Sequence, residues 1–258
     1  MGGDEFCLLV PAATDVAPIA AGIAERTGPL DITASFGSAV VGVEVSGATE
    51  ALQLVDERLY SQKYGRAGGS ADQACSALLQ ALAERHPSLG LHSETVRELA
   101  EVTARQLGLA DEQISRLRLA ARLHDVGKVA VPDSILEKPA ALDDDEWSLI
   151  HRHTIVGERI LAATPALQHV AAIVRATHER WDGAGYPDRL AGAEIPLIAR
   201  IVFGADAYDA MTGDRPYGLA MLPAEAIEEL RRGAGTQFDP AVVAAIERAL
   251  EAPAYVEA

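Results

Sequence analysis

The 258-residue sequence lacks the features of membrane-spanning, secreted and nucleic-acid-binding proteins. No apolar run approaches the roughly eighteen residues of a membrane helix, and the start, Met1 to Phe6, lacks the basic segment of a signal peptide. Its two cysteines, Cys7 and Cys75, are far apart and not at zinc-finger spacing, so we expect free thiols. The net charge of −16 argues against nucleic acid or an anionic membrane as partner. We therefore expect a soluble, cytoplasmic protein in which an anionic substrate needs a local positive site.

The spacing of apolar residues along the sequence changes near residue 70. Residues 1–66 predict strands alternating with helices, whereas from Ser70 apolar residues recur at helical spacing almost to the end. Pro87 to Gly90 is predicted to interrupt this helical part. Because 49% of the residues are hydrophobic, the chain can bury a sizeable core. The sequence thus predicts a mainly α chain preceded by a short α/β segment.

The most informative stretch runs from His124 to Lys128 at the end of a predicted buried helix. Adjacent side chains leave a helix about 100° apart, so one metal at its surface can take both His124 and Asp125. Lys128 lies one turn further on and can face the same pocket. Ionisable groups at a buried helix end need partners. A metal site is one reading; a His124–Asp125 bond or a helix cap is the other.

Further candidate ligands lie on or at the ends of predicted helices. The full set is His92, His124, Asp125, His153, His178 and Asp206. Four imidazoles with two carboxylates suit iron, manganese or zinc better than magnesium or calcium. His151 and His153 are predicted to point to different faces, so only one easily enters the site. A helical bundle could collect all six ligands.

Three segments of the first 66 residues are informative: Gly2–Phe6, Ser35–Ala39, and Val55–Tyr60 with Lys63, Gly65 and Arg66. Through these segments the first 66 residues resemble the C-terminal half of the GGDEF domain of diguanylate cyclases. The other half of that domain carries its first metal-binding Asp and its guanine recognition, and it would lie before Met1. We therefore expect no cyclase activity. A fragment, a misplaced start and a decayed domain remain open as explanations.

Five motifs follow one another in the helical part: His124–Lys128, His153 with Gly157, His178–Pro187, Ala205–Ala210 and Gly235–Pro240. In these motifs and their order, roughly residues 70–250 resemble the HD-GYP family of cyclic-di-GMP phosphodiesterases. This resemblance implies a mainly α chain, with an all-helical HD-superfamily bundle following the truncated α/β half-domain. We expect a partial GGDEF domain over 1–66, a linker and connecting helix over 67–90, and the HD-GYP domain over 91–252.

The same resemblance assigns the metal ligands. One metal would be held by His92, His124, Asp125 and Asp206, and a second by Asp125, His153 and His178. The family usually has a histidine pair where this chain has Thr177-His178, and a third metal needs a Glu where Ser88 stands. We therefore expect two divalent ions, iron or manganese, with the second held weakly.

The resemblance also assigns catalytic and substrate contacts. His124, Asp125 and Lys128 would be catalytic, Lys128 and Arg215 would contact phosphate, and Tyr186 would lie against guanine or phosphate. Asp209 is also assigned to substrate binding. Gly218 replaces a usual basic residue, so one phosphate contact is expected to be lost.

The expected activity is metal-dependent hydrolysis of cyclic di-GMP to linear pGpG in bacterial second-messenger signalling, with onward cleavage to GMP left open. Two alternatives remain. An impaired site would make the chain a cyclic-di-GMP receptor or a scaffold for GGDEF-domain proteins, and Thr177 favours this view. The same centre could also hydrolyse another cyclic dinucleotide. A homodimer is also left open.

Overall fold

The computed structural model of the protein describes residues 38–40, 51–52, 55, 68–85, 87–213 and 220–251. The chain divides after Gly69 into two compact units, and almost all described residues belong to the second. The GGDEF-like half-domain predicted over 1–66 lies almost entirely outside the described residues, as do Cys7 and Arg215. Cys75 is a free, buried cysteine, as predicted.

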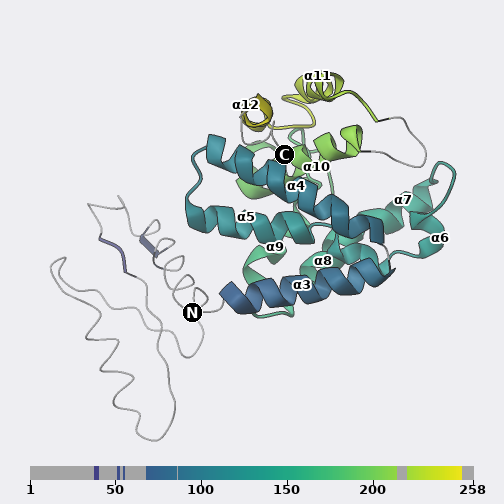
Figure 1. Ribbon diagram of the computed structural model, residues 1–258, viewed down its shortest axis with the longest axis horizontal. Helices are drawn as coiled ribbons and strands as arrows, with labels where there is room; N and C mark the ends of the chain where they lie inside the picture. The colour runs from purple at the N-terminus through teal and green to yellow at the C-terminus, as the bar shows by residue number, and fades with distance from the viewer. Residues whose placement is uncertain are drawn as a thin grey trace, which may run out of the picture. The chain divides into compact units, whose positions relative to one another are not determined.

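The described part of the second unit is helical (Figure 1). Its α-helices are α3 (Gly68–Arg85), α4 (Pro87–Gln106), α5 (Asp111–Leu123), α6 (Asp133–Leu136), α7 (Asp144–His151), α8 (His153–Ala162), α9 (Ala171–Arg175), α10 (Leu197–Thr212), α11 (Pro223–Gly233) and α12 (Pro240–Glu251). Three 3-10 helices accompany them, η1 (Val126–Ala130), η2 (Gln168–Val170) and η3 (Gly192–Glu194). The prediction of a mainly α chain is confirmed for these residues. None of the helices described here combines the length and the apolar character needed to span a membrane.

One predicted boundary was wrong. The segment from Pro87 to Gly90 does not interrupt the helices but forms the first turn of α4. Proline suits this position because the first helical N–H groups have no intrahelical partner. The helix that leads to the His-Asp pair ends at Leu123, so Asp125 lies beyond it with φ −100° and ψ 3°.

Helix α5 joins two hydrophobic clusters. Its residues Ile114 and Leu117 pack in the cluster built by α4, α10, α11 and α12, whereas Leu119 and Leu123 pack with residues of α3, α8 and α9. Figure 1 shows α4 and α5 side by side, and α4 also contacts α10 and α12. The end of α5 therefore emerges where the two clusters meet, and its position is set from both sides.

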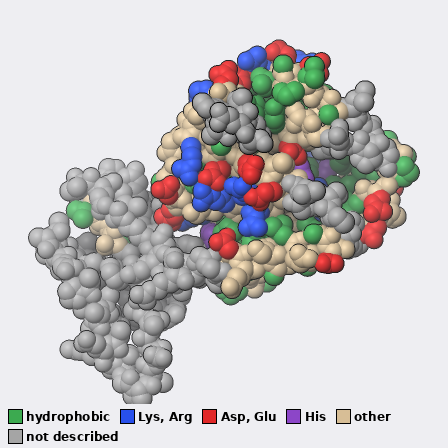
Figure 2. All heavy atoms as spheres, viewed as in Figure 1, with side chains coloured by type: hydrophobic (Ala, Val, Ile, Leu, Met, Phe, Trp, Pro, Cys, Tyr) green, Lys and Arg blue, Asp and Glu red, His purple; other side chains and the backbone are tan. Residues whose placement is uncertain are grey.

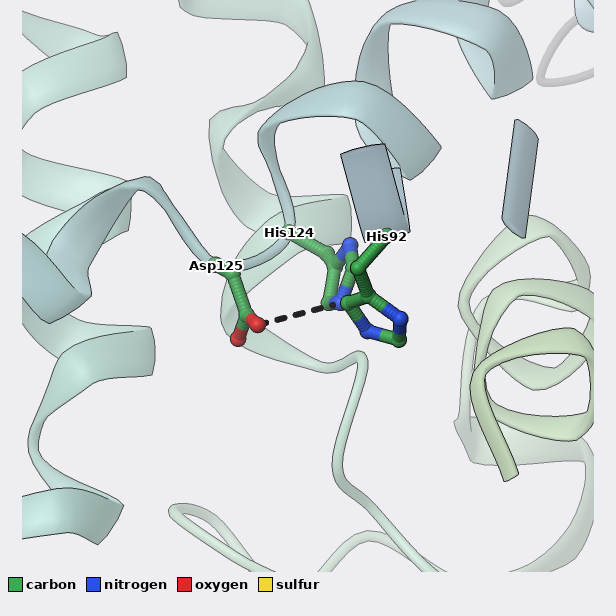
Figure 3. Close-up of side chains that lie close together, drawn as sticks. All are labelled: His92, His124 and Asp125. Carbon is green, nitrogen blue, oxygen red and sulfur yellow. Dashed lines mark ion pairs between the residues drawn. The ribbon is translucent and has the colours of Figure 1, made fainter. Parts of the chain in front are cut away.

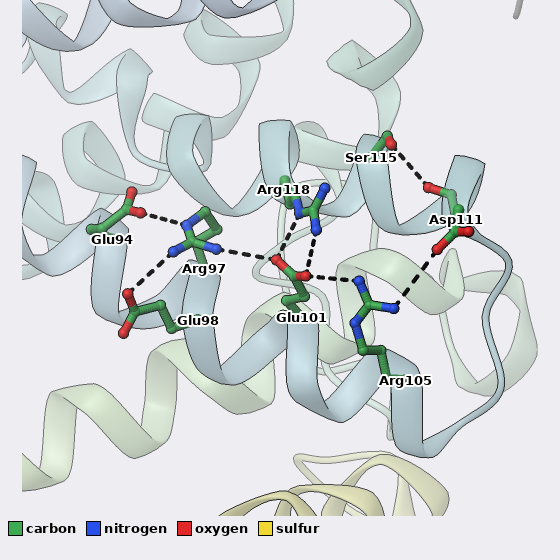
Figure 4. Close-up of polar contacts among 8 residues, drawn as sticks. All are labelled: Glu94, Arg97, Glu98, Glu101, Arg105, Asp111, Ser115 and Arg118. Carbon is green, nitrogen blue, oxygen red and sulfur yellow. Dashed lines mark hydrogen bonds and ion pairs between the residues drawn. The ribbon is translucent and has the colours of Figure 1, made fainter. Parts of the chain in front are cut away.

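Ion pairs cover the outer side of α4 and α5. Figure 2 shows Lys, Arg, Asp and Glu side chains interspersed on this face. In Figure 4, the carboxylate of Glu101 on α4 accepts a hydrogen bond of 2.6 Å from Arg118 on α5. The same carboxylate forms ion pairs with Arg97 and Arg105 of its own helix. Hydrogen bonds from Arg118 and Arg105 lower the pKa of Glu101 to about 2. This network ties α4 to α5 on the side away from the hydrophobic core.

Gly127 permits the closest approach in this region. A Cβ at this position would lie 1.9 Å from the carbonyl oxygen of His153 and 2.6 Å from the amide nitrogen of Gly157. A side chain at position 127 would overlap the backbone of α8, so α8 would have to move away from η1 to admit it. The glycine of the His-Asp motif thus sets how closely His153 approaches Asp125.

We expect Gly127→Ala to lower the free energy of unfolding by about 3 kcal/mol, because backbone must move to admit the methyl group. Gly157→Ala is the matched control, since its Cβ would meet the Val174 side chain at 3.3 Å. The control is expected to lose roughly 1 kcal/mol or less. Equal losses in urea denaturation of the two variants would contradict this packing account.

Candidate metal centre

The predicted ligands converge from five parts of the chain. His92 lies on α4, His124 and Asp125 follow α5, His153 begins α8, His178 follows α9, and Asp206 lies on α10. All six side chains lie in one region, where each contacts at least one of the others. His124, Asp125 and His153 are each 1% exposed, so these polar groups are removed from water. This arrangement agrees with the prediction that the six side chains come together in one helical bundle.

The first ligand group consists of His92, His124 and Asp125. Each offers one ligand atom, and these atoms lie within 4.8 Å of one another. Figure 3 shows the three side chains directed toward a common point, with Nε2 of His124 3.5 Å from Oδ2 of Asp125. Such spacing fits coordination of one ion better than direct hydrogen bonding.

The second ligand group consists of Asp125, His153 and His178, again with ligand atoms within 4.8 Å of one another. Nε2 of His153 lies 3.4 Å from Oδ1 of Asp125. Asp125 therefore belongs to both groups and offers a different oxygen to each. A carboxylate placed in this way is suited to bridge two metal ions.

Buried polar atoms without hydrogen-bond partners indicate whether a metal ion fits this site. Four ligand atoms are buried without a hydrogen-bond partner among the described residues: Nε2 of His124, Oδ1 of Asp125, Nε2 of His153 and Nε2 of His178. Buried polar atoms are rarely left without a partner. Their convergence, in a set of nitrogen and oxygen donors, fits divalent metal and disfavours the reading of a mere cap.

Backbone carbonyls orient two of the imidazoles. Nδ1 of His124 lies 2.7 Å from the carbonyl oxygen of Ala121, and Nδ1 of His153 lies 2.7 Å from that of Ile150. A carbonyl can only accept, so each Nδ1 carries a proton, and in the neutral ring it is Nε2 that has the lone pair a metal takes. Both rings are thereby prepared as metal ligands before any ion binds.

The two acids of α10 both contact His92. Asp206 lies 2.9 Å from its Nε2 and Asp209 lies 2.5 Å from its Nδ1. The prediction that the two acids share a helix side is confirmed. Asp209, which the resemblance assigns to substrate binding, contacts the candidate ligand His92, and a contact of this kind orients metal-binding histidines.

Charged side chains lie close together in the centre. Burial opposes ionisation of Asp125, yet Lys128, His124 and His153 keep its pKa well below the usual range. Nζ of Lys128 lies 2.6 Å from Oδ2 of Asp125, so the predicted approach of Lys128 to this pocket is confirmed. Burial, together with His153, lowers the pKa of His178 to about 3, which leaves a neutral imidazole.

Thr177 stands beside His178 and is also buried. Its hydroxyl donates to the carbonyl oxygen of Val174 at 2.8 Å. The hydroxyl proton is used within its own helical turn, and Thr177 belongs to neither ligand group. The second group thus has three candidate ligands in the described part of the chain.

The loop from Gly183 to Pro187 borders the second ligand group. The Tyr186 ring stacks on His178 with centroids 5.3 Å apart and on His151 with centroids 3.9 Å apart. Only His153 of the 151/153 pair belongs to a ligand group, as predicted. The sequence analysis did not predict that His151 stacks on Tyr186. The available signal was the position of His151 two residues before the candidate ligand His153.

The chain is similar to known proteins in sequence and in fold. The HD domain family matches residues 76–242. The chain is 40% identical over 178 residues to the cyclic di-GMP phosphodiesterase response regulator RpfG of Xanthomonas campestris pv. campestris, covering 68% of this chain and 47% of that protein. It is also 40% identical over 168 residues to 3'3'-cGAMP-specific phosphodiesterase 2 of Vibrio cholerae, covering 64% of this chain and 32% of that protein. The chain spans less than half the length of these relatives.

Among solved structures, Bd1817, an HDG"Y"P protein from Bdellovibrio bacteriovorus, aligns with a TM-score of 0.55. The alignment covers 80% of this chain and 74% of that chain, at 18% identity. The Vibrio cholerae phosphodiesterase V-cGAP3 aligns with a TM-score of 0.52 over 64% of this chain and 45% of that chain, at 20% identity. At these identities the likeness supports the helical fold.

His92 is expected to titrate abnormally in the metal-free protein. Burial alone lowers its pKa, but hydrogen bonds to Asp206 and Asp209 raise it from 6.5 to about 9. The protonated form therefore stabilises the metal-free fold below pH 6.5, and this contribution is lost as pH rises through 9. NMR titration of the ring should show this raised pKa, and Asp209→Asn should lower it. A pKa near 6.5 in both proteins would contradict the contacts described.

Proposed function

The chain belongs to the HD domain family, and we propose that it is a metal-dependent phosphodiesterase of the HD-GYP type that hydrolyses cyclic di-GMP to linear pGpG. The observation that carries this proposal is the position of Asp125 between two groups of buried ligand atoms. Paired metal sites of this kind suit phosphodiester hydrolysis. The relatives named as cyclic-di-GMP phosphodiesterases support the same substrate class.

In this proposal His92, His124, Asp125 and Asp206 hold one ion, and Asp125, His153 and His178 hold the second. Iron or manganese suits this mixture of imidazole and carboxylate. When bound, the ions would polarise the phosphate and activate water. Backbone carbonyls accept from Nδ1 of His124 and of His153 and so fix these two rings, and Asp209 orients His92 through Nδ1.

Substrate contacts are assigned to residues at the edge of the centre. Lys128 carries a positive charge beside Asp125 and is placed to donate hydrogen bonds to a phosphate. Both faces of the Tyr186 ring are covered by histidines, so we assign Tyr186 to phosphate through its hydroxyl and not to a stacked guanine. Arg215 remains a proposed phosphate contact outside the described residues.

A receptor without catalysis is the second candidate function, because Thr177 leaves the second ligand group with three members. Hydrolysis of a mixed cyclic dinucleotide is also consistent with the relatives named as 3'3'-cGAMP-specific phosphodiesterases. Partnership with GGDEF-domain proteins, homodimer formation and a cytoplasmic location stay predictions of the sequence.

Removing a ligand should abolish hydrolysis. We expect His124→Ala and Asp125→Ala, in protein purified without oxygen and supplied with manganese, to lower the rate of pGpG formation at least 100-fold and to reduce bound metal. His169→Ala is the control, because this histidine belongs to neither ligand group. Normal turnover in Asp125→Ala, measured by chromatography of products, would refute the metal assignment.

Thr177→His should strengthen the second site, because imidazole binds divalent transition metals more tightly than a neutral hydroxyl. We expect metal affinity there to rise about tenfold or more, on the scale of a metal-site contact. Thr177→Val, which keeps the shape but lacks the hydroxyl, should leave affinity unchanged. If the valine variant instead loses metal in a competition titration with a coloured chelator, the hydroxyl is itself a ligand.

A further inference from the structure

A pocket of about 480 Å³ opens beside the metal centre. It is lined by His151, Tyr186, Pro187, Arg189 and the backbone of Gly183–Gly185. Its size falls within the range of small-molecule sites, about 300–1,000 Å³. Because Tyr186 also stacks on His178, the pocket is separated from a ligand residue by the thickness of one ring.

Two of the lining rings, His151 and Tyr186, belong to a column of aromatic rings. Trp147 lies 5.7 Å from His151, which lies 3.9 Å from Tyr186, centroid to centroid. Tyr186 in turn lies 5.3 Å from His178. The column fills the spaces between its rings, so a planar ligand cannot enter between them. It must use the open pocket and the polar groups that point into it.

Arg189 reaches the pocket with an unusual backbone conformation. Its φ is 58°, a left-handed value that few residues other than glycine adopt. Glu179, which is 1% exposed, accepts hydrogen bonds from the amides on both sides of it, Asp188 at 2.6 Å and Leu190 at 3.1 Å. A buried carboxylate thus holds the chain in the conformation that presents Arg189. A left-handed non-glycine residue of this kind persists only where its surroundings hold it, as the two amide contacts of Glu179 do here.

Arg189 is also available to a ligand. Its side chain is exposed and makes no ion pair within the part of the chain that the structure describes. The adjacent acid, Asp188, is occupied by Arg175 through two hydrogen bonds of 2.6 and 2.8 Å. In a chain of net charge −16, a guanidinium that forms no ion pair with the described residues and lines a pocket is a local site for electron-rich atoms.

We propose that this pocket is a guanine-binding subsite and that Arg189 determines specificity by pairing with the base. This inference rests on the proposed function and names which part of the substrate the pocket takes. The paired donors of arginine match the O6 and N7 acceptors of guanine, whereas adenine presents a donor at the position of O6. The base would lie along the pocket while a phosphate of the same molecule reaches the metal centre past Tyr186.

The test compares Arg189→Gly and Arg189→Lys with the native chain. Glycine adopts a left-handed backbone without strain, so the melting temperature of Arg189→Gly should equal or exceed that of the native chain. Its binding of the guanine analogue should nevertheless fall. Lysine keeps the charge but cannot form the paired contact. Arg248→Ala is the control, because Arg248 is exposed on α12 and lines no part of this pocket.

Binding is measured on the manganese-loaded full chain with hydrolysis-resistant phosphorothioate analogues of cyclic di-GMP and cyclic di-AMP. We expect both Arg189 variants to bind the guanine analogue about 10- to 100-fold more weakly. Binding of the adenine analogue should change less than about threefold. Unchanged guanine binding in Arg189→Gly would overturn the subsite, and full retention in Arg189→Lys would replace guanine recognition with a charge contact to phosphate.

The outcomes separate this inference from the proposed function. If the native chain hydrolyses cyclic di-GMP but Arg189→Gly binds both analogues normally, the subsite fails and the enzyme assignment stands. If the native chain hydrolyses no cyclic dinucleotide but its guanine preference depends on Arg189, the subsite stands and the catalytic proposal fails. Failure of the native chain to bind either analogue would overturn both.

Discussion

The structure depends on one buried carboxylate with an oxygen directed to each of two histidine groups. Asp125 is 1% exposed, and a carboxylate so far from water requires cations or donors around it. Lys128 supplies one positive charge, yet Oδ1 of Asp125 and three facing imidazole nitrogens lack partners among the described residues. Divalent ions would satisfy all of these atoms together. The surrounding fold can be understood as the means of holding this carboxylate in place.

Local packing determines how the ligands meet. Helix α5 is positioned by hydrophobic clusters on both of its sides, and it ends one residue before His124. Gly127 then lets η1 approach the start of α8, which places His153 opposite Asp125. Two imidazole protons are fixed by carbonyls three residues earlier in the chain. The ligand orientations are therefore largely local, while their assembly depends on tertiary packing.

The sequence predicts the helical fold and the approach of His124, Asp125 and Lys128, because these depend on helical periodicity and short spacing. It could not predict that Asp209 contacts His92, a contact across 117 residues, since no local pattern encodes such a distance. The conformation of Arg189 was equally hidden, because it depends on the amide contacts of a buried glutamate. Pro87 was misread because proline both ends and begins helices.

The most direct test of this account is the electron paramagnetic resonance spectrum of the metal-free chain titrated with manganese. If Asp125 joins two sites, the spectrum at saturation should show two magnetically coupled ions per chain, and Asp125→Asn should remove the coupling. A signal from isolated ions only, at full occupancy of the native protein, would contradict the shared carboxylate.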